Sequence, residues 1–319
     1  MKAELAELVR VTCPICGGQN FEPLRRLNGY RIVRCLSCRF ATVNPRPTEE
    51  AILRAYMGDS AREDLSFASA YASERPVESY GSWTGQWILK RFLGGSRGAR
   101  FLDIGADHGW AVLEAERLGA ESWGYEFGDD RSYKNDPRLN KKIHRDEKSL
   151  FAHPESFDRL FCSAVIEHVY HPTEFLKHWM RLLKPDGRFC VAAAPNLDSI
   201  FIRAGWDGWG GNIPPHHLNY FTPQTLDACV RAAGGEVLEI FTMGMPMTAH
   251  PRNMFRQRSF EEALDAAQAK EWAFAKPHGA SPSASNPVVP LANHLLKGMG
   301  WGANLYVIFK KSGRAEGTC

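Results

Sequence analysis

One stretch, residues 99–109 (ARFLDIGADHG), constrains the fold of this 319-residue chain more than any other. Phe101, Leu102 and Ile104 form a short apolar run that is typical of a buried parallel strand, and Asp103 interrupts it with a charge close to the end of the strand. A loop bracketed by Gly105 and Gly109 follows, and residues 110–118 have the pattern of a helix. Ligands of open α/β sheets bind outside the carboxyl ends of the strands, where glycines let the backbone approach them. The stretch therefore predicts an α/β protein with a ligand at this loop, and a purely structural turn is the alternative.

The glycine spacing narrows the choice of ligand. The loop reads GADHG, which lacks the dinucleotide pattern G-x-G-x-x-G. It resembles the first motif of the class I S-adenosylmethionine-dependent methyltransferases, D/E-x-G-x-G-x-G, because Asp103, Gly105 and Gly109 occupy three of its four fixed positions. Asp107 replaces the remaining glycine, where its carboxylate either crowds the methionine end of the cofactor or bonds its ammonium group. The resemblance implies a cofactor site that includes these four residues and Ala106.

Acidic residues follow the next two expected strands. Glu126 lies about 20 residues after the loop, an interval that places a carboxylate beside a ribose diol. Its neighbour Phe127 is a further candidate for contact with the cofactor. Asp146 and Glu147 follow an expected third strand over residues 141–145. The resemblance implies that Asp146, or Glu147 in its place, accepts from the adenine amino group, and a solvated loop charge is the alternative.

Residues 156–196 resemble the family's S-F-D…E-H-V-x-x-P…L-K-P-G-G…P-N run. The run predicts a fourth strand, a helix that begins at Pro172 and a fifth strand over residues 188–194. Ser163 and His168 come directly after the fourth strand. The resemblance implies that both residues lie under the cofactor.

Two C-x-x-C pairs stand near the start of the chain, Cys13 with Cys16 and Cys35 with Cys38. Each pair places two thiolates on one side of a tight turn, and two such turns complete a tetrahedron around zinc. A closed four-sulfur site has no open position for a substrate, so the Zn²⁺ is expected to be structural. A redox or disulfide pair is the alternative, which a reducing compartment disfavours.

The resemblance implies a Rossmann-like, seven-stranded methyltransferase sheet with helices on both faces. Its sixth strand is expected over residues 236–242 and its last over 304–309, antiparallel between the fifth and sixth. In resembling enzymes the helices before the sheet form a lid, where Tyr71 or Tyr80 either touches a ligand or packs in the core. The expected segments are a zinc ribbon (1–46), helical lid and linker (47–95) and methyltransferase core (96–319) with an insertion at about 245–303.

Histidines are the candidates for a general base, because the pKa of histidine suits proton transfer near neutral pH. His216 and His217 lie in a glycine- and aromatic-rich loop over residues 199–221, which should overhang the cofactor edge of the sheet. His168 and His171 are the next candidates. The alternative is that the histidines hydrogen-bond their own loop.

Composition limits the class of protein and its partners. Charged residues make up 24% of the chain and the net charge is only +3, which indicates a globular protein without a dedicated nucleic-acid surface. No run is long and apolar enough to span a membrane, and the first 13 residues lack the apolar core of a signal peptide. A cytoplasmic location is therefore expected.

Three functions remain open at this point. The first is methyl transfer to a small molecule, a sugar, nucleotide-sugar or natural-product intermediate, because a zinc ribbon ahead of this core looks like enzymes of those pathways. The second is an RNA- or protein-directed methyltransferase, which predicts a basic stripe continuing onto the core from Arg25, Arg26, Arg31, Arg34 and Arg39. The third is a non-catalytic cofactor-binding protein, suggested by Asp107.

Overall fold

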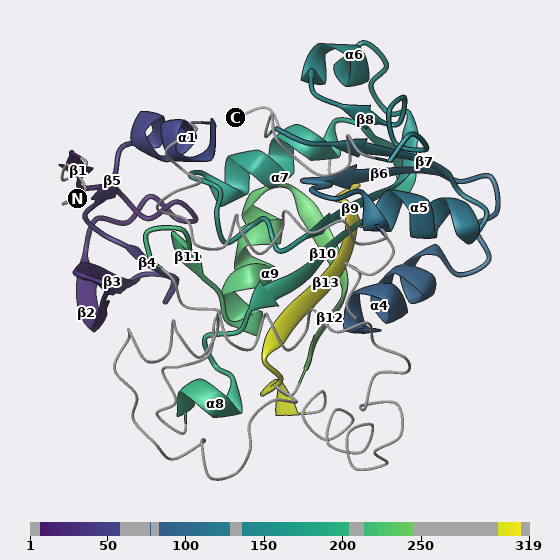
Figure 1. Ribbon diagram of the computed structural model, residues 1–319. Coiled ribbons are helices and arrows are strands. Elements are labelled where there is room, and N and C mark those ends of the chain that lie inside the picture. The colour runs from purple at the N-terminus through teal and green to yellow at the C-terminus, as the bar shows by residue number, and fades with distance from the viewer. Residues whose placement is uncertain are drawn as a thin grey trace, which may run out of the picture.

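The computed structural model describes residues 7–57, 77, 83–127, 136–203, 214–244 and 299–313 (Figure 1). Its centre is a seven-stranded sheet of order β12-β13-β10-β9-β6-β7-β8. The strands are β6 (Arg100–Ile104), β7 (Glu121–Tyr125), β8 (Ile143–His144), β9 (Phe157–Ser163), β10 (Leu183–Pro195), β12 (Gly235–Met243) and β13 (Asn304–Lys311). All strands run in the same direction except β13, which lies between β10 and β12 and pairs antiparallel with both. The expected Rossmann-like methyltransferase sheet is confirmed.

Helices cover both faces of this sheet (Figure 1). Their bounds are α1 (Glu49–Met57), α4 (Trp83–Leu93), α5 (Trp110–Arg117), α6 (Glu147–Phe151), α7 (Pro172–Met180), α8 (Ile200–Arg203) and α9 (Pro223–Ala232). Pro172 and Pro223 occupy the first helical turn of α7 and α9, where a missing N–H breaks no hydrogen bond. No helix within the described ranges is both long and apolar enough to cross a membrane.

Alternating side chains of the strands build two core layers. Phe101 and Phe161 point into a layer with Ile88 of α4 and Ala111 of α5. Their neighbours on the same strands, among them Leu102, point into the other layer, which α7 and α9 cover. Because successive strand residues face opposite sides, the central strands β6 and β9 are buried on both faces. This burial fixes the carboxyl ends of β6 and β9 beside each other.

A second sheet carries the cysteines and takes one strand from the core. Its order is β11-β4-β3-β2, with β2 (Phe21–Leu27), β3 (Tyr30–Cys35), β4 (Ala41–Val43) and β11 (Asn219–Tyr220); β1 (Leu8–Val9) pairs separately with β5 (Arg46–Pro47). The strand β11 belongs to the loop that follows the fifth strand of the main sheet. The ribbon expected over residues 1–46 is therefore incomplete by itself, because its edge is closed by residues 219–220.

Polar contacts reinforce this junction between ribbon and core. The Thr42 hydroxyl donates to the Leu218 carbonyl at 2.9 Å. The Asn219 side-chain amide donates to the carbonyls of Ile166 at 3.0 Å and Val169 at 2.7 Å. Asn219 is 1% exposed, so these bonds form without competition from water. The ribbon, β11 and the turn after β9 are therefore held as one unit.

Some expected elements fall outside the described residues. Tyr71, Tyr80 and the insertion up to residue 298 belong to them. The lid expected over residues 47–95 is represented by α1, α4 and the single residue Val77, which packs beside the cofactor loop region in a small cluster with Ala106 and Leu139.

Replacing Asn219 with alanine tests the junction. The variant leaves two carbonyls without their donor, so the free energy of unfolding should fall by about 1–3 kcal/mol. Urea unfolding measures the change. The control is Asn140→Ala at an exposed turn position, expected within about 0.5 kcal/mol of the parent; equal effects of the two substitutions would contradict the role given to Asn219.

Candidate functional site

The loop after β6 has the backbone geometry that its glycines predict. Gly105 and Gly109 have φ of +76° and +81°, in the left-handed region that side chains disfavour. A Cβ on Gly105 would lie 2.6 Å from Cγ2 of Val165, and one on Gly109 would lie 2.6 Å from Cδ1 of Leu139. Both positions therefore require glycine for conformation and for space.

Asp107, the departure from the family motif, has a left-handed backbone conformation that glycine adopts readily. Its φ is +45°, a region that aspartate tolerates better than most residues. Its backbone N–H donates to Oε2 of Glu126 at 2.8 Å. The carboxylate at the end of β7 is thus fixed against the bend of the loop, as the interval between the two predicted.

Three carboxyl groups meet at this loop, those of Asp103, Asp107 and Glu126. Asp103 is 3% exposed, and burial raises its pKa well above the usual value, with further increases from the negative charges of Glu126 and Asp107. Oδ1 of Asp103 is buried without a hydrogen-bond partner among the described residues. Such a group of acids favours a cationic ligand, and the two glycines give the loop its bend. S-adenosylmethionine, with a sulfonium and an ammonium group, fits both features.

The other candidate cofactor residues lie along the same edge of the sheet. Asp146 caps α6, accepting from the Lys148 N–H at 3.0 Å, and Glu147 accepts from Nε2 of His178 at 2.9 Å. Phe127 follows Glu126 and is 43% exposed. No contact decides between Asp146 and Glu147 as the adenine ligand, so that assignment stays a prediction.

His168 lies in the turn that follows β9, five residues after Ser163, the last residue of the strand. Its Nδ1 is 2.9 Å from the carbonyl oxygen of His216, so Nδ1–H donates and Nε2 keeps its lone pair in the neutral ring. The ring of His217 stands nearly perpendicular to that of His168, with 4.7 Å between the ring centroids. Three of the four candidate histidines therefore gather at one place.

Glu167 completes this histidine cluster. Its Oε1 lies 3.9 Å from Nε2 of His168, and Glu167, His168 and His217 each place one such atom within 4.8 Å of the others. Burial raises the pKa of Glu167 to about 8 and lowers the pKa of His216. The cluster thus holds histidine nitrogens and a carboxyl group poised for proton exchange.

His171 lies apart from the cluster. It stands at the N-cap of α7, half-exposed, with Nε2 3.9 Å from Oε2 of Glu49 in α1. Sequence spacing gave His171 and His168 equal standing because both follow the fourth strand. Only the fold shows that His168 turns toward the loop carrying His216.

The cofactor loop and the histidine cluster are physically linked. Val165, whose Cγ2 fills the space beside Gly105, comes three residues before His168, and the His168 N–H donates to the Val165 carbonyl. The motifs did not predict that Val165 and Glu167 belong to the site. They also did not predict that Asn219 fixes the turn after β9. The E-H pair of the family motif was the available signal for Glu167.

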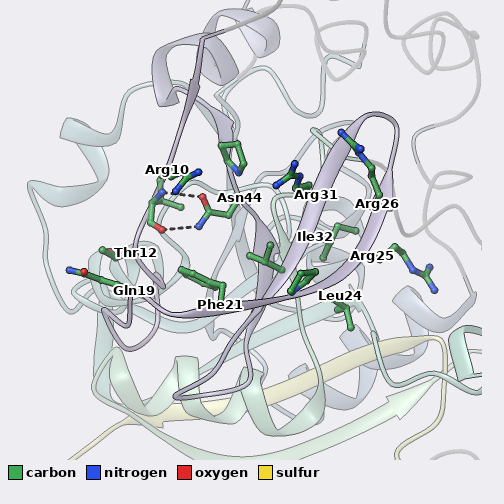
Figure 2. A pocket seen from close by; sticks show the side chains of 14 residues that line it. Arg10, Thr12, Gln19, Phe21, Leu24, Arg25, Arg26, Arg31, Ile32 and Asn44 are labelled. Carbon is green, nitrogen blue, oxygen red and sulfur yellow. Dashed lines mark hydrogen bonds between the residues drawn. The ribbon is translucent and has the colours of Figure 1, made fainter.

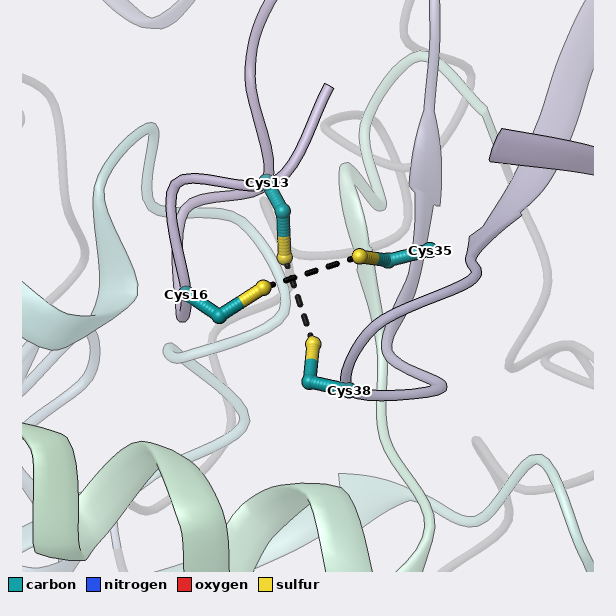
Figure 3. A group of neighbouring side chains, drawn as sticks. All are labelled: Cys13, Cys16, Cys35 and Cys38. Carbon is teal, nitrogen blue, oxygen red and sulfur yellow. Dashed lines mark hydrogen bonds between the residues drawn. The ribbon is translucent and has the colours of Figure 1, made fainter. Parts of the chain in front are cut away.

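The four cysteines converge as their spacing predicted (Figure 3). The Sγ atoms of Cys13 and Cys38 are 3.4 Å apart, and those of Cys16 and Cys35 are 3.6 Å apart. All four sulfurs lie within 4.8 Å of one another. Zinc–sulfur bonds of about 2.3 Å in a tetrahedron separate sulfurs by roughly 3.8 Å, so the group fits a zinc ion after small adjustments.

Comparisons with known proteins agree with this geometry. A family model described as "Methyltransferase domain" matches residues 83–240. The ubiquinone biosynthesis O-methyltransferase of Xanthomonas euvesicatoria is 25% identical over 158 residues, which cover 46% of this chain and 66% of the relative. The protein of the same name from Xanthomonas oryzae is 25% identical over 148 residues, covering 43% of this chain and 62% of the relative. The chain thus spans just under two thirds of these relatives.

A solved structure shares the fold. A chain of the complex between the Haloferax volcanii methyltransferase activator Trm112 and a methyltransferase superimposes with a TM-score of 0.51 at 14% identity, covering 83% of this chain and 99% of that one. At this identity the likeness concerns the fold alone. The matched family model, the glycine loop and the acid at the end of β7 lead to one conclusion: residues 83–240 form a methyltransferase domain of the S-adenosylmethionine-dependent type.

Proposed function

We propose that this protein transfers a methyl group from S-adenosylmethionine to a small-molecule acceptor, a sugar, nucleotide-sugar or natural-product intermediate, in the cytoplasm. The observation that carries the proposal is the adjacency of two groups at one sheet edge. One is the acidic glycine loop, and the other is the cluster of Glu167, His168 and His217, joined to the loop through Val165. A cation-binding bend beside a proton acceptor is what methyl transfer to a hydroxyl or amine requires.

Different residues at the loop would contact different parts of S-adenosylmethionine. Gly105 and Ala106 present backbone, Glu126 faces the ribose, and Asp103 and Asp107 balance the positive charges. When bound, S-adenosylmethionine supplies a methyl group already activated by its sulfonium. Holding such reactants in line is worth several kcal/mol, because orientation is then established before the reaction.

The histidine cluster would remove the acceptor's proton. Nε2 of His168 is the first choice, because the carbonyl of His216 fixes the opposite nitrogen as the donor. His217 is the second choice, 4.7 Å away between ring centroids. Glu167, whose pKa burial raises to about 8, lies 3.9 Å from Nε2 of His168 and would compensate the new charge by releasing its own proton. A hydroxyl acceptor is supported by the relatives, which are named O-methyltransferases.

Charge pairing favours a small acceptor over RNA. In the ribbon, Arg39 and Arg34 lie 2.8 Å and 3.8 Å from the same carboxylate oxygen of Glu22. On the core, surface cations pair with acids; examples are Arg91–Glu239, Lys184–Asp158 and Arg231–Asp227. The continuous basic stripe that an RNA-directed enzyme would need does not emerge over the described part of the core. The non-catalytic alternative was suggested by Asp107. It is less well supported, because Asp107 has a positive φ that glycine adopts readily.

We also propose that the four cysteines hold one structural zinc ion. Cys13 and Cys35 are buried in the main core cluster, so an unliganded site would place thiols in apolar surroundings. Mass spectrometry of metals should find about one zinc per chain. Cys38→Ser should lose it, whereas Cys190→Ser, a buried strand cysteine outside the group, should retain it. Full-length protein that folds without zinc would contradict the assignment.

Gly105→Ala should weaken cofactor binding at least tenfold. The added methyl would meet Val165 at 2.6 Å in a backbone region that disfavours side chains. Calorimetric titration with S-adenosylhomocysteine measures the effect. The matched control is Gly234→Ala, also at positive φ (+87°) but with nothing within 4 Å of the new Cβ. Equal losses in both variants would show that backbone strain, and not the loop, governs binding.

Removing the base should lower the rate of methyl transfer and leave cofactor affinity unchanged. His168→Ala should lower kcat by about 10²–10⁴, and His217→Ala should have a smaller effect. His171→Ala, half-exposed and outside the cluster, is the control and should retain the parent rate. Transfer of labelled methyl to a panel of sugars, sugar nucleotides and phenols provides the assay. A full rate in His168→Ala and His217→Ala together would disprove the proposed base.

A further inference from the structure

A cavity of about 870 Å³ lies on the ribbon and is unused by the function proposed above. It opens beside the β2–β3 hairpin and the segment before Cys13, and no acidic residue of the described ranges lines it (Figure 2). Four arginines do: Arg10, Arg25, Arg26 and Arg31. We call this cavity the ribbon groove. Its volume is in the range of small-molecule sites.

Local sequence fixes the arginines of the hairpin. The turn Asn28-Gly29, with φ of +50° and +79°, is of the two-residue kind that suits the twist of antiparallel strands. It sets the register in which Arg26 of β2 stands directly opposite Arg31 of β3. Like charges directly opposite each other on paired strands destabilise the sheet. An anion bound between them would remove that repulsion.

Three of the four arginines in the ribbon groove have no counter-charge within the part of the chain that the structure describes. Among the residues that the structure describes, no ion pair or side-chain hydrogen bond involves Arg10, Arg26 or Arg31. Arg39 lies between β3 and β4 and does not line the groove. Its guanidinium group forms an ion pair with Oε1 of Glu22 at 2.8 Å. Arg34 and Arg39 thus share the carboxylate of Glu22, whereas the four other arginines named here line the cavity.

The wall and floor of the groove are preformed. Asn44, which stands between Arg10 and Arg31 in Figure 2, accepts from the Val11 N–H at 3.2 Å and donates to the Val11 carbonyl at 2.9 Å. Leu24 and Ile32 contribute apolar surface beside the arginines. The groove therefore offers a charged side for phosphates and an apolar side for a flat ring.

We propose that the ribbon groove binds a nucleoside diphosphate group. Arg26 and Arg31 would bind the two phosphates through paired N–H donors, since the planar guanidinium matches phosphate geometry. Arg10 would bind the outer phosphate, and the base would lie on the apolar side. This inference does not rest on the proposed methyl transfer, because every lining residue belongs to the ribbon and to the segment up to Pro45.

Calorimetry on the full-length, zinc-loaded chain tests the proposal. UDP, pyrophosphate and uridine are titrated in turn, with the cofactor site saturated by S-adenosylhomocysteine. UDP should bind and pyrophosphate should bind more weakly, whereas uridine should give no heat. Arg26→Ala/Arg31→Ala should weaken UDP binding at least tenfold, while Arg39→Ala should stay within twofold. Raising the salt concentration should weaken binding in the parent protein.

Folding and competing ligands are controlled separately. Because both arginines are exposed, the double variant should keep its zinc and, without repulsion across the hairpin, unfold at the same or a higher temperature. UDP should raise the melting temperature of the parent and leave that of the variant unchanged. Absent UDP binding, or binding unaffected by the double substitution, overturns the proposal.

Two further outcomes would also overturn it. Uridine binding as well as UDP would remove the role of the phosphates. A single-stranded RNA that binds more tightly than UDP, with loss in the same double variant, would identify the groove as a nucleic-acid surface. If the chain fails to bind S-adenosylhomocysteine, the proposed function fails, yet the UDP titrations still decide the fate of the ribbon groove.

Discussion

The pairing of β11 with β4 is the interaction on which the arrangement of the site depends. It joins two residues of a core loop to the edge of the zinc ribbon. Through it the ribbon carries His216 and His217, which precede β11, and through the Asn219 amide it also holds the turn that bears His168. The four-cysteine ribbon is therefore a support for the histidine cluster as well as for its own strands.

The constraint at the cofactor loop is electrostatic. Asp103, Asp107 and Glu126 bring negative charge together where burial already opposes ionisation of Asp103. Such crowding is unfavourable in the absence of a cation, and it becomes favourable when a sulfonium and an ammonium enter. The left-handed glycines on either side of Asp107 set the bend of this loop, where an added Cβ would meet Val165 or Leu139. Repulsion among these carboxyl groups thus lowers the stability of the loop at the place where negative charge is needed to bind the cofactor.

Local signals predicted the elements well. Short apolar runs placed the central strands, Pro172 marked the start of α7, and Thr222 caps α9 as its capping box indicates. The two cysteine pairs converge for the same reason, because short-range spacing fixes each of them. β11 could not be predicted, since a two-residue strand has no periodicity. Nor could the choice between His168 and His171, which depends on contacts with a loop 48 residues away.

The junction has a consequence for the order in which the molecule matures. Thr42 and its partner Leu218 are 176 positions apart in the chain. As the polypeptide leaves the ribosome from its amino end, the cysteine-bearing hairpins emerge long before the strand that closes their sheet. During that interval β4 presents an unpaired edge, the feature of nascent chains that invites association with other molecules. Early capture of metal by the thiolates would hold these hairpins together until translation delivers their missing neighbour.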